Sequence, residues 1–79
     1  MKLGEFIGKI AFWSGLSQKE LAEKMGVTAP HLNEIIRGRR SVSAKTAKKL
    51  EGIFGIPAAV WAVYQSMEDI SKYEEEEEV

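Results

Sequence analysis

Glycines at positions 15, 26, 38 and 55 end successive apolar segments, so most of this chain can form only short helices. Before these glycines, apolar residues recur at the three- and four-residue spacing of one helix face. Because short helices are marginal in water by themselves, the segments must stabilise one another by packing. No segment shows the alternation of apolar and polar residues that is typical of a strand. The sequence therefore predicts an all-α domain of five helices.

Residues that cap helix N-termini mark where the predicted helices begin. Ser17, Thr28 and Ser43 are suited to this role, and Glu20 stands where it would complete a capping box with Ser17. Pro30 falls in a first turn, where a missing N–H costs no helical hydrogen bond. We expect a helix of about ten residues from Leu3, two helices within residues 17–38, a fourth that ends at Gly55, and a fifth over about residues 57–71.

The residue types that most catalytic and metal sites require are scarce. The 79 residues include no cysteine, one histidine (His31) and one aspartate (Asp69). These counts argue against disulfides, thiolate nucleophiles, a His–Asp catalytic pair and a zinc site. We therefore expect no metal, no cofactor and no enzymatic activity.

The apolar run that includes residues 57–64 is far shorter than the ~20 residues that span a membrane. The start of the chain also lacks the basic and apolar regions of a secretory signal. We therefore expect a cytoplasmic protein that does not associate with membranes.

Charge is unevenly distributed, although the net charge is only −1. Residues 37–49 include six basic side chains and no acidic one, whereas residues 74–78 are all glutamate. A concentrated basic segment attracts polyanions whatever the net charge of the chain, although an ordinary solvated helix face would also account for it. We expect a domain over residues 1–73 that binds nucleic acid, followed by an acidic tail over residues 74–79.

Residues 17–38 have the pattern of a helix-turn-helix motif, in which two short helices flank a turn containing glycine. Gln18, at the start of the first helix, is placed to bind a phosphate, because backbone N–H groups are free at a helix N-terminus. The second helix must pack against the core through its apolar stripe. The opposite face is then free to enter a major groove. The stripe is formed by Leu32, Ile35 and Ile36, and the outward residues are Ala29, Pro30, Asn33, Glu34 and Arg37.

Several spacings in the chain resemble those of a known superfamily. The pattern Ser17-Gln18-x-x-Leu21-Ala22-x-x-x-Gly26-Val27-Thr28, followed by Leu32, Ile35, Ile36 and Gly38, resembles the helix-turn-helix of the phage repressor/Cro-type (Xre) superfamily. More narrowly, the segments that are similar to those of HigA-type antitoxins are Gly4-Glu5, Gly15-Leu16-Ser17-Gln18, Pro30-x-x-Asn33-Glu34-Ile35, Gly38-x-Arg40 and Pro57-x-x-x-Trp61. The resemblance implies a lambda-repressor-like fold and a homodimer on a palindromic DNA operator. It also implies repression of its own operon and neutralisation of a small basic toxin that cleaves messenger RNA.

The resemblance further implies roles for individual residues. Gln18 and Thr28 would contact phosphates, Arg39 would contact the DNA backbone, and the outward residues of the second motif helix would face the groove. Glu34 has two interpretations, since instead of contacting a base it could pair with Arg37 one turn away or with the arginines that flank Gly38. Together with the neighbouring cations and His31, the predicted DNA-binding residues are Gln18, Thr28, Ala29, Pro30, His31, Asn33, Glu34, Arg37, Arg39, Arg40 and Lys45.

Residues 58–64 are apolar all round, although a surface helix of a small domain needs only one apolar side. We expect Trp61 and Tyr64 to face the core. The remaining stripe then lacks a partner within the chain and predicts a dimer interface. Its residues are Val60, Val63, Met67 and Ile70. Phe12 and Trp13 lie off the main stripe of the first helix, and we expect them to pack beneath the ends of the chain.

Three functions are compatible with these features. The favoured one is a DNA-binding repressor that is also the HigA-like antitoxin of a two-gene module. A second is a stand-alone phage or plasmid Cro-type repressor with no toxin. A third, from a different class, is a protein-interaction module that does not bind DNA.

Overall fold

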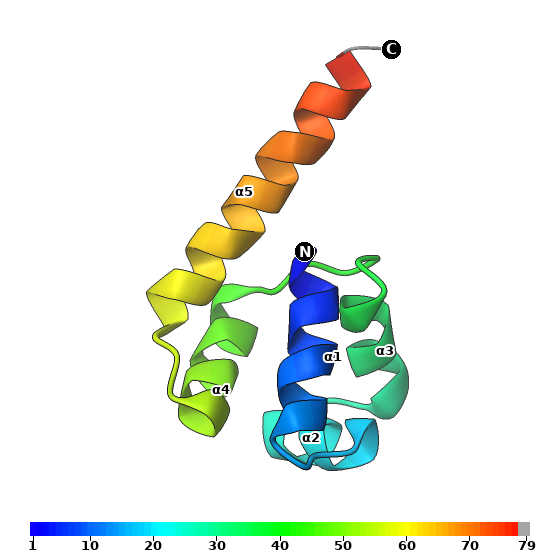
Figure 1. Cartoon of the computed structure of the whole chain (residues 1–79), viewed down its shortest axis with the longest axis vertical. Coiled ribbons are helices and arrows are strands. Elements are labelled where there is room, and N and C mark those ends of the chain that lie inside the picture. Colours follow the sequence, from blue (N-terminus) through cyan, green and yellow to red (C-terminus); the bar gives the residue numbers. More distant parts are fainter. Residues whose placement is uncertain (78–79) are drawn as a thin grey trace.

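Five helices account for most of the chain in the computed structural model, which describes residues 1–77. They are α1 (Leu3–Trp13), α2 (Gln18–Met25), α3 (Ala29–Ile36), α4 (Ala44–Phe54) and α5 (Ala58–Glu77). The described residues include no strand, and the predicted all-α fold is confirmed. α1 to α4 pack together, whereas α5 starts beside α4 and extends away from them (Figure 1). This projecting helix makes the molecule elongated, with extents of 39 × 23 × 21 Å.

The predicted caps form at the predicted helix starts. The Glu20 backbone N–H donates to Ser17 Oγ, and the Ser17 backbone N–H donates to Glu20 Oε1, both at 3.1 Å. Thr28 Oγ1 accepts from the His31 backbone N–H at 3.2 Å. Gly26 ends α2 with a φ of 70°, which a residue with a Cβ rarely adopts. These local signals fix the turn between α2 and α3.

The core draws at least one residue from every helix and one from the loop before α4. Trp61 on α5 is 1% exposed, and Tyr64 is half-buried beside it, as predicted for the inner face of this helix. Of the predicted α3 stripe, Leu32 and Ile35 are buried and Ile36 is half-buried. The buried apolar residues are Leu3, Ile7, Ala11, Leu21, Ala22, Met25, Leu32, Ile35, Val42, Ala47, Leu50 and Trp61.

An aromatic cluster holds the start of α5 against α1 and α4. The ring centroid of Trp61 lies 5.6 Å from that of Phe6 and 6.4 Å from that of Phe54. Trp61 Nε1–H donates to the Ile56 carbonyl at 3.0 Å, so the indole nitrogen has a partner although the ring is buried. The first turns of α5 are therefore fixed to the rest of the domain.

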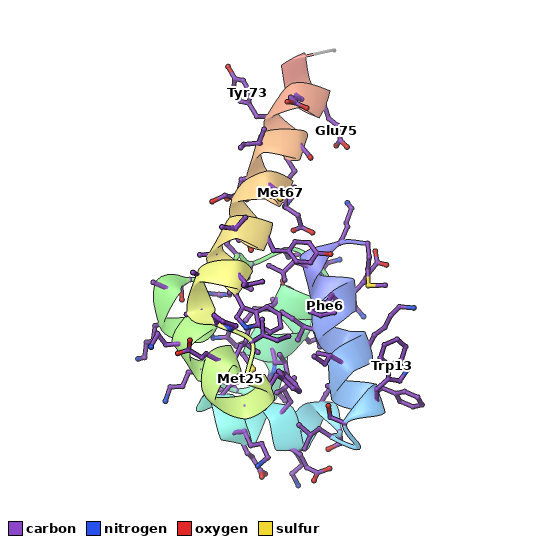
Figure 2. All side chains as sticks on the ribbon, turned by 60° about the vertical axis from the view of Figure 1, so that its left-hand side comes forward. Phe6, Trp13, Met25, Met67, Tyr73 and Glu75 are labelled. Atoms are coloured by element: carbon purple, nitrogen blue, oxygen red, sulfur yellow. The ribbon has the colours of Figure 1, made fainter. Side chains whose placement is uncertain are left out.

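The prediction for Phe12 and Trp13 is wrong. They are 78% and 76% exposed at the end of α1, and Trp13 points away from the molecule (Figure 2). The helical turn of about 100° per residue places both side chains outside the stripe formed by Leu3, Ile7 and Ala11. Their exposure shows that no other element within residues 1–77 covers that side of α1.

The fifth helix is longer than predicted, since it continues from residue 71 to Glu77 and so includes most of the acidic segment. Glu78 and Val79, the last residues of the predicted tail, lie outside the described residues. Within residues 1–77, no helix combines the length and apolar character needed to cross a membrane.

Candidate nucleic-acid interface

The α2–turn–α3 unit leaves one side of α3 uncovered. Leu32 and Ile35 face the core, whereas Ala29 and Pro30 are exposed in the first turn and Arg37 is exposed at the C-cap. Asn33 and Glu34, which we predicted to be outward, are half-buried. The face that the sequence assigned to DNA is therefore open at both ends of α3 and partly covered at its middle.

Four of the predicted residues line one hollow between α3 and α4. Thr28 and His31 border it from the start of α3, Arg40 from the loop, and Lys45 from the first turn of α4. The caps of both helices, Thr28 and Ser43, lie at this hollow, so the positive ends of two helix dipoles meet there. Cations together with helix N-termini make this a suitable surface for phosphate groups.

Sequence reasoning missed three further residues of this hollow, Ser41, Ser43 and Lys49. The cations of this helix were expected beside the phosphates as a group, but only Lys45 was named among the predicted DNA-binding residues. The place of Lys49, between one and two turns from the start of α4, gave no sign that it would reach the turn after α2. Packing of α4 on α2 brings it there, and its Nζ is the atom nearest to a Cβ built on Gly26, at 3.9 Å.

The other predicted DNA residues lie outside the hollow. Gln18 is exposed as the first residue of α2, and Arg39 is exposed in the loop after α3. Between α3 and that loop, the Arg37 backbone N–H donates to the Asn33 carbonyl at 3.0 Å and the Arg39 backbone N–H to the Glu34 carbonyl at 2.9 Å. The Glu34 carboxylate makes no ion pair with Arg37. Among the side chains of residues 1–75, the ion pair that forms joins Lys48 and Glu51.

α5 presents a second uncovered surface. Val60, Val63, Met67 and Ile70 are all exposed, as predicted, and we call these four residues the α5 stripe. A shallow groove runs along this side, lined by Val60, Val63 and Met67 of the stripe together with Met1 and Tyr64. Met67 and, further along, Tyr73 stand on the projecting part of the helix (Figure 2).

Among the side chains that the structure describes, those of residues 1–75, no group of three or more His, Asp or Glu could hold a metal ion. His31 instead lies among hydroxyl groups and cations in the hollow.

The sequence profile of the helix-turn-helix family matches residues 13–61, which include the α2–turn–α3 unit, the basic loop and α4. The chain belongs to this family. The helix-turn-helix protein is 34% identical over 64 residues to virulence-associated protein I of Dichelobacter nodosus. The alignment covers 81% of this chain and 59% of the relative, so the chain spans less than two thirds of that protein.

Solved structures of antitoxins share the fold of this helix-turn-helix protein. Pseudomonas aeruginosa antitoxin HigA, solved with the higBA promoter, is 28% identical with a TM-score of 0.85, over 92% of this chain and 80% of that one. Antitoxin GraA is also 28% identical, with a TM-score of 0.88 over 96% of this chain and 83% of that one. These similarities confirm the resemblance to HigA-type antitoxins.

Proposed function

We propose that this protein is a dimeric, sequence-specific DNA-binding repressor that acts as the antitoxin of a toxin–antitoxin pair. The observation that carries the DNA-binding part is the open face of α3 beside a hollow with Arg40, Lys45 and Lys49. A helix with one free face fits a major groove, and cations beside it neutralise phosphates. The similarity to an antitoxin solved with its promoter supports the same function.

Within this proposal, the exposed residues of α3 read base edges and the surrounding cations hold the backbone. Arg37 is suited to a guanine edge, because its guanidinium donates two parallel hydrogen bonds. Ala29 and Pro30 offer apolar contact, for example with a thymine methyl group. Gln18, Thr28, His31, Arg39 and Lys45 border the phosphates, whereas Asn33 and Glu34 contribute from partly covered positions.

A dimer follows from the same proposal, since a palindromic operator presents two half-sites about one helical turn, ~34 Å, apart. The α5 stripe is the surface that would join the two copies. It is apolar, exposed and on the helix that projects furthest from the domain. As in the prediction from sequence, residues 1–73 would then contain both the DNA-binding and the dimer surfaces.

The DNA-binding proposal is tested by substituting Arg37→Ala together with Arg39→Ala. The probe is a duplex enriched from a random library by the unmodified protein. We expect the double variant to bind about 10- to 100-fold more weakly, with a salt slope shallower by about 0.9 for each phosphate that is no longer neutralised. The control Lys2→Ala with Lys9→Ala removes the same charge from exposed positions just before and within α1. Equal effects of the two variants, or no enriched duplex at all, would contradict the proposal.

The antitoxin proposal needs a separate experiment. The protein is co-expressed with the product of the adjacent gene, and the complex is purified after nuclease treatment. We expect a small basic partner to remain bound, and growth that the partner alone arrests to be restored. Operator binding without any such partner would instead establish a stand-alone repressor.

A further inference from the structure

Gln65 is a buried polar residue on α5, and both ends of its amide have a hydrogen-bond partner. The side chain is 9% exposed. Gln65 Oε1 accepts from the Val42 backbone N–H at 2.8 Å, and Gln65 Nε2 donates to Asp69 Oδ1 at 2.9 Å. Asp69 thereby fixes which end of the amide faces Val42. The hydrogen bond to Val42 joins α5 directly to the backbone of the loop that follows α3.

That loop carries the exposed arginines of the DNA-binding face. Arg39 and Arg40 lie between two fixed points, the end of α3 and Val42, which is 6% exposed and part of the core. Arg40, Ser41 and Val42 also share a small hollow with Gln65, Glu68 and Lys72 of α5. The backbone that displays the arginines is therefore held on its inner side by α5.

We infer that Gln65 is a positioning residue for DNA binding, which holds the Arg39–Arg40 loop in place without touching DNA. The inference rests on the proposed function. Val42 lies within residues 13–61, which match the family profile, whereas Gln65 lies beyond them, so the acceptor of this hydrogen bond comes from outside the shared motif. Without Gln65, the buried Val42 N–H has no acceptor, and the loop must shift to reach water or another partner.

Gln65→Met tests the inference, because methionine has a similar length and no amide. We expect about tenfold weaker binding to the enriched duplex, the effect expected when a buried N–H is deprived of its acceptor. The salt slope should fall by about 0.9 for each phosphate that the displaced arginines no longer neutralise. Thermal unfolding and sedimentation are measured on the same samples, and Ser66→Ala, an exposed neighbour on α5, is the control.

A second variant separates positioning from electrostatics and from simple misfolding. Asp69 is exposed, so Asp69→Ala removes the partner that orients Gln65 with little change to the core. Removal of a negative charge alone should tighten DNA binding, whereas removal of the orienting hydrogen bond should weaken it. We expect about twofold to fivefold weaker binding. Glu75→Ala, which removes a similar exposed charge further along α5, should bind slightly more tightly.

The double variant Gln65→Glu/Asp69→Asn provides a rescue. The net charge is unchanged, and a carboxylate oxygen of Glu at position 65 can still accept from the Val42 N–H. Between positions 65 and 69 the hydrogen bond is reversed, because the Asn amide at 69 now donates and the Glu carboxylate at 65 accepts. We expect it to restore affinity and salt slope to near the original values. The inference would be overturned if the Gln65→Met variant folds and binds the duplex with unchanged affinity and salt slope. It would also be overturned if Asp69→Ala binds the duplex more tightly than the unmodified protein. Failure of the unmodified protein to bind any duplex would instead refute the proposed function.

Discussion

Gly4 lies where α1 passes closest to α3, and it has no room for a side chain. A Cβ at this position would lie 2.6 Å from the Ile35 carbonyl oxygen and even closer to that of Ile36. Both are backbone atoms, which cannot rotate away. We therefore expect Gly4→Ala to lower the free energy of unfolding by about 1–3 kcal/mol in urea denaturation, because the helices must move apart.

Gly8, one turn along the same helix, is the matched control. The nearest atom to a Cβ built there is Ile36 Cγ2, at an ordinary contact distance of 3.8 Å. Because alanine is a better helix former than glycine, Gly8→Ala should raise the free energy of unfolding by about 0.5–1 kcal/mol. If both substitutions changed the free energy of unfolding equally, the close contact of α1 with α3 at Gly4 could not be the reason for the loss of stability.

The side-chain carboxylate of Glu51, on α4, accepts hydrogen bonds from its own helix and from the start of α5. Lys48 Nζ donates to it at 2.8 Å, and the Ala58 backbone N–H, at the start of α5, donates at 3.0 Å. These bonds, the lysine first, hold the pKa of Glu51 below its ordinary value of 4.5. The charged form is therefore favoured in the folded state, and its contribution to stability is present above pH 4.5 and lost as pH falls further.

The measurement compares the unmodified protein with Glu51→Gln in denaturant between pH 7 and pH 3. The unmodified protein should be more stable at pH 7, and the difference should narrow as pH falls through the lowered pKa of Glu51. Glu23→Gln, at an exposed position on α2, should show no comparable convergence. A difference that stays constant down to pH 3 would contradict this role for the carboxylate.

At the scale of the helices, local signals predicted most boundaries. The Ser17–Glu20 capping box and the left-handed glycines at positions 26 and 55 depend on neighbours in the chain, so they can be recognised without the fold. The inward position of Trp61 and the exposure of the α5 stripe also followed from helical periodicity.

The features that the sequence did not predict depend on how residues far apart in the sequence pack against one another. Phe12 and Trp13 have the composition of core residues, and only the arrangement of the other helices leaves them exposed. The predicted end of α5, near residue 71, came too early, because glutamate favours a helix even though a run of like charges opposes one. The place of Lys49 beside the turn after α2 and the contact of Gln65 with the Val42 backbone could not be read from the sequence, because the neighbours of both side chains lie on other elements.

The α5 stripe gives a prediction for the association of two copies. Met67→Lys together with Val63→Lys places two charges in the middle of an apolar surface. We expect these changes to weaken the dimer by at least about 100-fold, because a buried unpaired charge costs several kcal/mol. Sedimentation across a concentration range measures the effect. Ala62→Lys, at an exposed position on the same helix, is the control. A protein that is monomeric before substitution would refute the dimer.

For the whole molecule, the distribution of charge matters more than its sum. Arg40, Lys45 and Lys49 line the hollow of the candidate DNA face, whereas five of the twelve acidic residues follow one another at positions 74–78. The backbone of this acidic end is helical up to Glu77, so the projecting helix carries Glu74 and Glu75. They should repel the DNA backbone through the solvent.

Replacing the five glutamates of residues 74–78 with glutamine tests this effect and keeps the length of the chain. The formal net charge changes from −1 to +4, because five negative charges are removed. We expect tighter binding to a random duplex at low salt, and a gain that shrinks above ~0.1 M, where the Debye length is ~10 Å. Replacement by aspartate, which keeps the charge, should leave affinity unchanged. An equal gain at every salt concentration would rule out a screened electrostatic effect.

The contrast between the two tryptophans gives the protein a built-in optical probe. Trp61 is enclosed by Phe6 and Phe54 where three helices meet, whereas the Trp13 indole lies in water. Their fluorescence should therefore differ in colour, and acrylamide should quench Trp13 far more strongly than Trp61. In a Trp13→Phe variant, the remaining emission would come from the base of α5 alone. Detachment of that helix from the domain could then be timed directly, separately from the unfolding of the rest.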